Sequence, residues 1–177
     1  MDLIVEMPAN KVGVLSEGRV THNGLSRLFL YYVPTSYKQG DALPLMLTLH
    51  GRAFNAKQQL SDCKFVELSE RKGFIVIAPN CVTIDNDNNL ASEGLTFMDL
   101  QGVDPNNIRW NVDYPLHNSL GIDDVGYLSA LIDYIADEFK ADTRRVYVAG
   151  MSNGAVMSMR LATQLTHKFA GAAAICD

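Results

Sequence analysis

The sequence predicts an α/β fold with a mostly parallel sheet, an antiparallel hairpin near its amino end and helices on both faces. Two observations support this prediction. Asn23-Gly24, a strong hairpin signal, joins two strand-like segments at residues 12–20 and 25–33. Apolar runs of the kind that form strands buried on both faces alternate with helical segments, and these runs cover residues 44–49, 74–78, 145–149 and 169–175.

Three segments have the spacing of apolar residues that is typical of helices. The first covers residues 56–72, with Gly73 as its expected stop, and the last covers residues 153–165. The clearest is 122–139, whose apolar side chains line one face. Asp123 and Asp124 fall in its first turn, where acids complement the helix dipole, and we assign both this structural role.

Length and composition predict one globular domain. The chain has 177 residues, of which 47% are hydrophobic and 20% charged. No apolar run approaches the ~20 residues that cross a bilayer, and the first residues do not form a signal peptide. Three widely spaced cysteines fit neither a disulfide framework nor a metal site, so no metal or cofactor is predicted.

The net charge of −5 lies in one segment. Residues 82–121 hold six acids against Arg109, and the rest of the chain is balanced. This charge pattern provides no basic face for nucleic acid. The segment also lacks periodicity, so we expect a long acidic loop over the sheet edge where ligands bind.

Two parts of this loop resemble ligand-binding elements. Residues 85–89 resemble the start of a calcium loop, but Leu90 and Thr96 occupy the positions of the required glycine and bidentate acid. We therefore expect solvated loop there. Trp110, the only tryptophan, is expected to form a wall of the substrate cleft, with a core or loop anchor as the alternative.

The most informative motif is G-M-S-N-G at residues 150–154, directly after the apolar run 145–149. A strand that runs through G-x-S-x-G into a helix is the nucleophile elbow of the α/β-hydrolases. The sharp turn lifts the serine Oγ clear of the sheet, and the glycines let strand and helix approach closely. The motif predicts Ser152 as a nucleophile; the alternative is an ordinary glycine-rich turn.

Two backbone N–H groups are expected to hold the negative charge that such a nucleophile creates. One belongs to Asn153, the residue after the nucleophile, and the other to Arg52, in the loop after Leu49-His50. His50 belongs to this loop and is expected to lie beside the substrate. Its backbone and packing should matter more than its imidazole.

Three motifs together resemble the polyhydroxybutyrate-depolymerase-like esterases, a group that includes feruloyl and acetylxylan esterases. They are L-H-G at 49–51, G-I-D-D-V-G-Y at 121–127 and the strand and elbow at 145–154. The resemblance implies an α/β-hydrolase fold and a serine esterase that acts on polyester, feruloyl or acetyl esters through an acyl-enzyme. It also suggests a secreted protein. Arg52 departs from the family pattern, since many relatives have cysteine there.

The catalytic base is the missing part of this interpretation. In the order Ser, Asp/Glu, His the base comes last, and after Ser152 the chain offers only His167 and Asp177. His167 reads as a solvated turn residue, His22 lies at the hairpin, and His117 lies in the acidic loop, from which an approach to the serine is conceivable.

We therefore expect residues 1–177 to be one incomplete α/β-hydrolase domain. The acid and the base would follow residue 177, and the chain alone would be inactive. Two alternatives remain open at this point. One is a serine peptidase of the same fold, and the other is a catalytically incomplete binding module.

Overall fold

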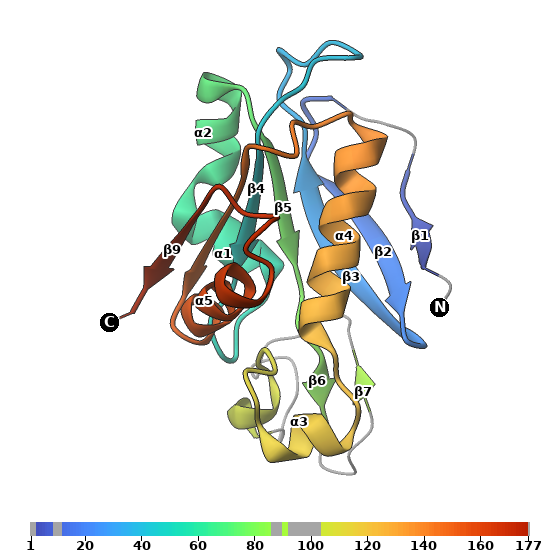
Figure 1. The fold of residues 1–177 in the computed structure, drawn as a ribbon, viewed down its shortest axis with the longest axis vertical. Helices are drawn as coiled ribbons and strands as arrows, with labels where there is room; N and C mark the ends of the chain where they lie inside the picture. The colour runs from blue at the N-terminus through green and yellow to red at the C-terminus, as the bar shows by residue number, and fades with distance from the viewer. Residues whose placement is uncertain (1–2, 9–11, 86–89, 92–103, 177) are drawn as a thin grey trace.

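The computed structural model describes residues 3–8, 12–85, 90–91 and 104–176. Its main element is a seven-stranded sheet with the order β1-β2-β3-β5-β4-β8-β9 (Figure 1). The strands of this sheet are β1 (Ile4–Glu6), β2 (Ser16–His22), β3 (Leu25–Tyr32), β4 (Leu45–Leu49), β5 (Ile75–Pro79), β8 (Val146–Met151) and β9 (Gly171–Ile175).

The strand pairing divides the sheet into two halves. Pairing is antiparallel from β1 through β2 and β3 to β5, and parallel from β5 through β4 and β8 to β9. The strands of the parallel half are nearly continuous apolar runs, as strands covered on both faces must be. The predicted fold class, including the hairpin at Asn23-Gly24, is confirmed.

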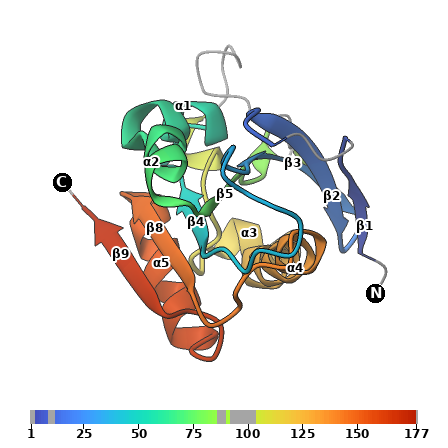
Figure 2. The same ribbon diagram turned by 90° about the horizontal axis from the view of Figure 1, so that it is seen from above.

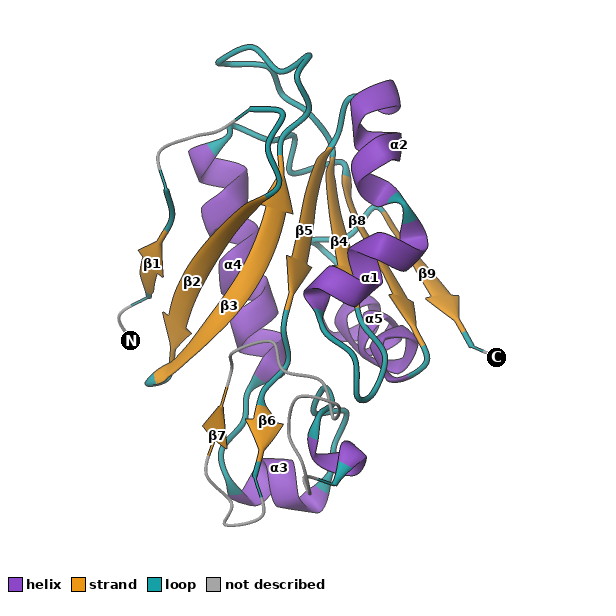
Figure 3. Cartoon of the chain, turned by 180° about the vertical axis from the view of Figure 1, so that it is seen from behind, coloured by secondary structure: helices purple, strands orange, loops and turns teal. Residues whose placement is uncertain are grey.

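Helices cover both faces of the sheet (Figures 2 and 3). The helices α1 (Ala56–Cys63) and α2 (Phe65–Lys72) pack on one face. The helices α4 (Asp124–Glu138) and α5 (Asn153–Gln164) pack on the other, over the larger apolar core. Within the described part of the chain, no helix has the length and apolar character needed to cross a membrane.

The helix predicted over residues 56–72 is two helices. Lys64 has φ 55° and ψ 28°, a left-handed conformation that ends α1 and begins α2. The buried face of α1 includes Ala56 and Leu60, and Val66 of α2 packs against the same apolar cluster. The bend at Lys64 gives α2 a different direction from α1.

The predicted long acidic loop at 82–121 has more regular structure than expected. Its described residues include a small two-stranded sheet, β6 (Thr83–Ile84) with β7 (Leu90–Ala91), a 3₁₀ turn (Pro105–Asn107) and the helix α3 (Pro115–Ser119). These elements lie beyond the carboxyl ends of β4 and β5 (Figures 1 and 3). Residues 86–89 and 92–103, which hold half of the six acids, lie outside the described residues.

Asp123 and Asp124 have different roles at the start of α4. The Asp123 carboxylate accepts the Gly126 N–H at 2.8 Å and so caps the helix. Asp124 is fully buried and forms an ion pair with Arg27 of β3, which is also fully buried. Asp124 therefore lies in the first turn of α4 with a structural role, as predicted, and its carboxylate additionally joins α4 to the sheet.

The surroundings of Arg27 and Asp124 compensate only part of the cost of burying them. Asp124 also accepts the backbone N–H of Asn111 at 2.5 Å. The Arg27 guanidinium lies 4.2 Å from the ring centroid of Tyr127, yet its Nε and Nη2 have no partner among the described residues. Removing one charge would leave the other buried without compensation.

We expect Arg27→Met to lower the free energy of unfolding by about 3–5 kcal/mol, because Asp124 would remain buried and unpaired. The double variant Arg27→Met/Asp124→Leu should recover much of this loss. The control is Lys140→Met, whose exposed pair with Asp137 should change the stability far less, because solvent screens it. Urea unfolding measures all three, and an Arg27→Met protein as stable as the control would contradict the interpretation.

Candidate active site

Ser152 occupies the turn between β8 and α5 and is exposed to solvent. Its backbone has φ 52° and ψ −118°, a conformation that costs a non-glycine residue about 1–3 kcal/mol. The surrounding structure fixes this conformation. The Ser152 N–H donates to the Ile175 carbonyl at 2.8 Å, and the Ser152 carbonyl accepts the N–H groups of Ala155 and Val156.

The glycines of the motif are required by close backbone contacts. A Cβ atom at Gly150 would lie 2.2 Å from the Gly154 carbonyl oxygen, and one at Gly154 would lie 2.3 Å from the Leu49 carbonyl oxygen. Both distances are too short for any side chain. The absence of these two side chains allows α5 to start directly against β4, which brings Ser152 next to the loop that follows β4.

A pocket of about 510 Å³ opens at Ser152. Its walls come from the segments after β4, β8 and β9 and from the segment before α3. All of these lie at the carboxyl end of the parallel strands, where open α/β sheets bind ligands. The lining residues are Arg52, Phe54, Tyr114, Met151, Ser152, Asn153, Val156 and Cys176. Among these described residues there is no histidine, aspartate or glutamate.

The structure brings Arg52 and Asn153 together with Ser152 at this pocket. Asn153 is the first residue of α5, so its N–H has no partner inside the helix. Among the described residues, no hydrogen bond uses the backbone N–H of either Arg52 or Asn153. The Arg52 side chain donates to the Asn106 Oδ1 at 2.7 Å and so is held toward the segment before α3.

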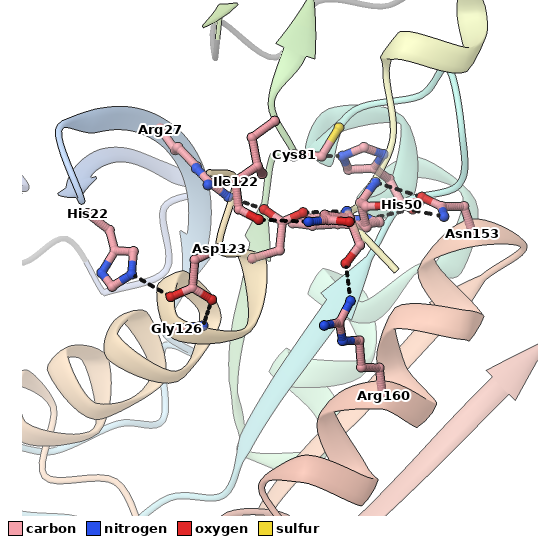
Figure 4. Close-up of polar contacts among 12 residues, drawn as sticks. His22, Arg27, His50, Cys81, Ile122, Asp123, Gly126, Asn153 and Arg160 are labelled. Atoms are coloured by element: carbon pink, nitrogen blue, oxygen red, sulfur yellow. Dashed lines mark hydrogen bonds and ion pairs between the residues drawn. The ribbon is translucent and has the colours of Figure 1, made fainter. Parts of the chain in front are cut away.

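His50 is fully buried beside this pocket, and its ring bonds to the backbone of Cys81 on one side (Figure 4) and of Gly51 on the other. The Cys81 N–H donates to its Nε2 at 3.1 Å. In the neutral ring Nδ1 therefore carries the proton and donates to the Gly51 carbonyl at 2.7 Å. Burial lowers the pKa of His50 to about 4, although the bond to Gly51 opposes this shift, so the ring is neutral at pH 7.

Trp110 is also fully buried. Its indole N–H donates to the His50 carbonyl at 2.9 Å, and its ring centroid lies 5.0 Å from that of His50. The Trp110 side chain therefore does not form the expected cleft wall, and His50, expected to act through its backbone and packing, does not present its imidazole to the pocket. Neither side chain reaches the pocket surface, and the core-anchor alternative describes Trp110.

The remaining histidines do not line the pocket. His117 on α3 is buried, and neither of its ring nitrogens has a partner among the described residues. Burial, and then the neighbouring Arg109, lower the pKa of His117. His22 contacts Asp123 at 3.3 Å, and His167 is exposed. The described residues therefore present no base at the Ser152 pocket.

Sequence reasoning missed most of the apolar pocket wall. Phe54 lies two residues after Arg52, and Val156 lies one turn into α5 after Ser152, and both are unusually exposed for apolar side chains. Their spacing from the two motifs was a usable signal. Tyr114 had no such signal, since its position depends on how the segment before α3 folds back.

The fold and this site define the class of protein. The chain has the sheet, the crossing helices and the strand–serine–helix turn of the α/β-hydrolase fold. Among solved structures it is similar to the acetyl xylan esterase from Aspergillus awamori, with a TM-score of 0.61 and 19% identity over 97% of this chain and 50% of that one. A likeness at this identity concerns the fold alone.

In sequence the chain is similar to carboxylic ester hydrolases. It is 26% identical over 147 residues to the bifunctional acetylxylan esterase/xylanase XynS20E of Neocallimastix patriciarum, covering 83% of this chain and 17% of that protein. It is also 26% identical to feruloyl esterase B of Neurospora crassa, covering 81% of this chain and 41% of that protein. The chain thus spans less than half the length of these relatives. No protein-family model matches it.

Acid should destabilise the protein through His50. The unfolded state takes up a proton near pH 6.5, whereas the folded state resists protonation down to about pH 4. The contribution of His50 to the free energy of unfolding is therefore complete above pH 6.5. It falls by on the order of 3 kcal/mol as the pH drops toward 4. Urea unfolding of the natural protein and of His50→Asn across this range should show a shallower pH slope in the variant. Equal slopes would contradict the buried neutral ring.

Proposed function

We propose that this protein is a serine carboxylic-ester hydrolase that works through an acyl-enzyme on Ser152. The observation that carries the proposal is the conformation of Ser152. It is an exposed serine, held at positive φ between strand and helix, in a pocket that also receives the Arg52 loop. Strain of this kind persists only where the surrounding structure enforces it, and it is concentrated at functional sites.

The proposed chemistry follows from the groups around the serine. Ser152 Oγ attacks the ester carbonyl carbon while a base accepts its proton, and the carbonyl oxygen becomes an oxyanion. The N–H groups of Asn153 and Arg52 donate to this oxyanion. Collapse of the intermediate expels the alcohol, which takes the proton from the base and leaves an acyl group on Ser152. Water then hydrolyses the acyl-enzyme by the same steps.

The base is proposed to come from outside the 177 residues, together with its acid partner. Support comes from the pocket, since no described histidine or carboxylate lines it and His50 is occupied by two backbone bonds. In the Ser, Asp/Glu, His order both groups follow the serine in sequence. The 177-residue chain alone should then be nearly inactive.

The substrate is proposed to be a polyester, or a feruloyl or acetyl ester on a polysaccharide. The similarity to an acetylxylan esterase and to a feruloyl esterase supports the second group. Phe54, Tyr114 and Val156 give the pocket an apolar wall that suits an acyl group. The chemistry uses no metal or organic cofactor, and an extracytoplasmic location remains part of the proposal.

One observation favours a second candidate, a binding module that keeps the fold without catalysis. This observation is that no described residue lining the pocket can act as a base. A peptidase of the same fold would use the same serine and differ in its leaving group. Ester hydrolysis and active-site labelling distinguish the binding module and the peptidase from an esterase.

We expect Ser152→Ala to abolish the hydrolysis of p-nitrophenyl acetate by the natural full-length protein, with kcat falling at least about 10³-fold because the acyl-enzyme cannot form. A fluorophosphonate probe should label Ser152 in the natural protein and nothing in the variant, as read by mass spectrometry. The 177-residue chain should label far more slowly.

Ser119→Ala is the matched control, because Ser119 is exposed on α3 and outside the pocket, so both readouts should be unchanged. A full-length protein that neither hydrolyses the ester nor reacts with the probe would leave the binding module as the better interpretation. Faster turnover of a p-nitroanilide than of the ester would indicate a peptidase.

A further inference from the structure

We propose that His50 and Trp110 are positioning residues that together fix the direction of the Arg52 N–H relative to that of Asn153. The inference rests on the proposed function, in which these two N–H groups hold the oxyanion. It concerns side chains that are fully buried and act only through the backbone.

The His50 side chain constrains the orientation of one peptide group. The Gly51 carbonyl and the Arg52 N–H belong to the same planar trans peptide, so they point in opposite directions. The His50 ring donates from Nδ1 to this carbonyl at 2.7 Å. The carbonyl is thereby held toward the buried ring, so the Arg52 N–H points the opposite way, and we infer that this is the side of the pocket that Arg52 lines.

The ring itself is held from behind. Its Nε2 accepts the N–H of Cys81, which follows β5, and its face packs against Trp110. Because the Cys81 N–H can only donate, Nε2 must accept, and in a neutral imidazole the proton is then on Nδ1. The backbone of Cys81 therefore selects the tautomer that can donate to Gly51.

Trp110 links this loop to the elbow helix. Its indole N–H holds the His50 carbonyl at 2.9 Å. Its backbone N–H donates to the Asn153 Oδ1 at 2.7 Å, and the Asn153 Nδ2 donates back to the Trp110 carbonyl at 3.4 Å. One residue thus contacts both of the chain segments that supply the proposed oxyanion donors.

Because both donors are tied to Trp110, their separation is set before substrate arrives. Donors fixed in advance cost no reorganisation during the reaction, which is the basis of their catalytic effect. Losing the His50–Gly51 bond would leave the Gly51 carbonyl with only the longer bond from the Phe54 N–H at 3.3 Å, so the orientation of the Gly51–Arg52 peptide would be less firmly fixed. This loss should weaken the stabilisation of the transition state and leave substrate binding unchanged.

Two variants of His50 separate this role from a merely structural one. Asparagine places an amide N–H near the position of Nδ1 and keeps the bond to Gly51, but it loses the bond from Cys81. Glutamine places an amide oxygen near the position of Nε2 and keeps the bond from Cys81, but it loses the bond to Gly51. Each variant breaks one buried hydrogen bond, so both should lose a similar amount of stability.

The first measurement does not depend on activity. Residual dipolar couplings of the natural protein report the directions of the Arg52 and Asn153 N–H bonds. We expect His50→Asn to keep the relative direction of the two bonds, and His50→Gln and Trp110→Phe to change it. Ser69→Ala is the control, since it removes a buried hydrogen bond to the Phe74 carbonyl on the opposite face of the sheet.

The second measurement is ester hydrolysis by the same proteins. His50→Gln and Trp110→Phe should lower kcat by about tenfold or more with little change in KM, a fraction of the 10²–10³-fold effect of deleting an oxyanion donor. His50→Asn and Ser69→Ala should retain kcat to within a few-fold.

The outcomes are distinguishable. Unchanged N–H directions in His50→Gln would overturn the positioning role, whatever the activity. Equal losses of kcat in His50→Asn and His50→Gln would also overturn it, because the effect would then follow stability alone. If the N–H directions change in His50→Gln but the natural protein hydrolyses no ester, the positioning role would be supported and the proposed function refuted.

Discussion

The structure depends on the close contact between the start of α5 and the end of β4. Gly154 lies against the backbone of Leu49 and His50, and Gly150 lies against Gly154, at distances that exclude any side chain. This contact places Ser152 beside the loop that carries Arg52. The position of Ser152 at the pocket therefore depends on the absence of two Cβ atoms.

A second layer of buried polar contacts keeps this arrangement rigid. His50, Trp110 and Asn153 connect the loops after β4 and β5 to the start of α5 through backbone groups. None of these bonds uses the Ser152 side chain, which stays exposed. Ser152 therefore lies at the surface, and the contacts that fix the backbone around it lie underneath.

The sequence predicted the features that depend on local pattern. Apolar runs located the strands, Asn23-Gly24 the hairpin, and G-x-S-x-G the turn at Ser152, because each has a steric or periodic cause within a few residues. The bend at Lys64 and the elements of 82–121 were missed, since they depend on which face packs against the sheet. The burial of Trp110 was missed for the same reason: its partners, His50 and Asn153, are 60 and 43 residues away.

The buried carboxylate of Asp124 has a consequence for changing the pocket. It holds Arg27 of the hairpin and the N–H of Asn111, and the Asn111 side chain in turn accepts the N–H groups of Asp113 and Tyr114. A wall residue of the pocket is thus connected to an antiparallel strand far from the serine. The segment before α3 cannot be exchanged as an independent module, and grafting it from another protein would require transferring Arg27 and Asp124 with it.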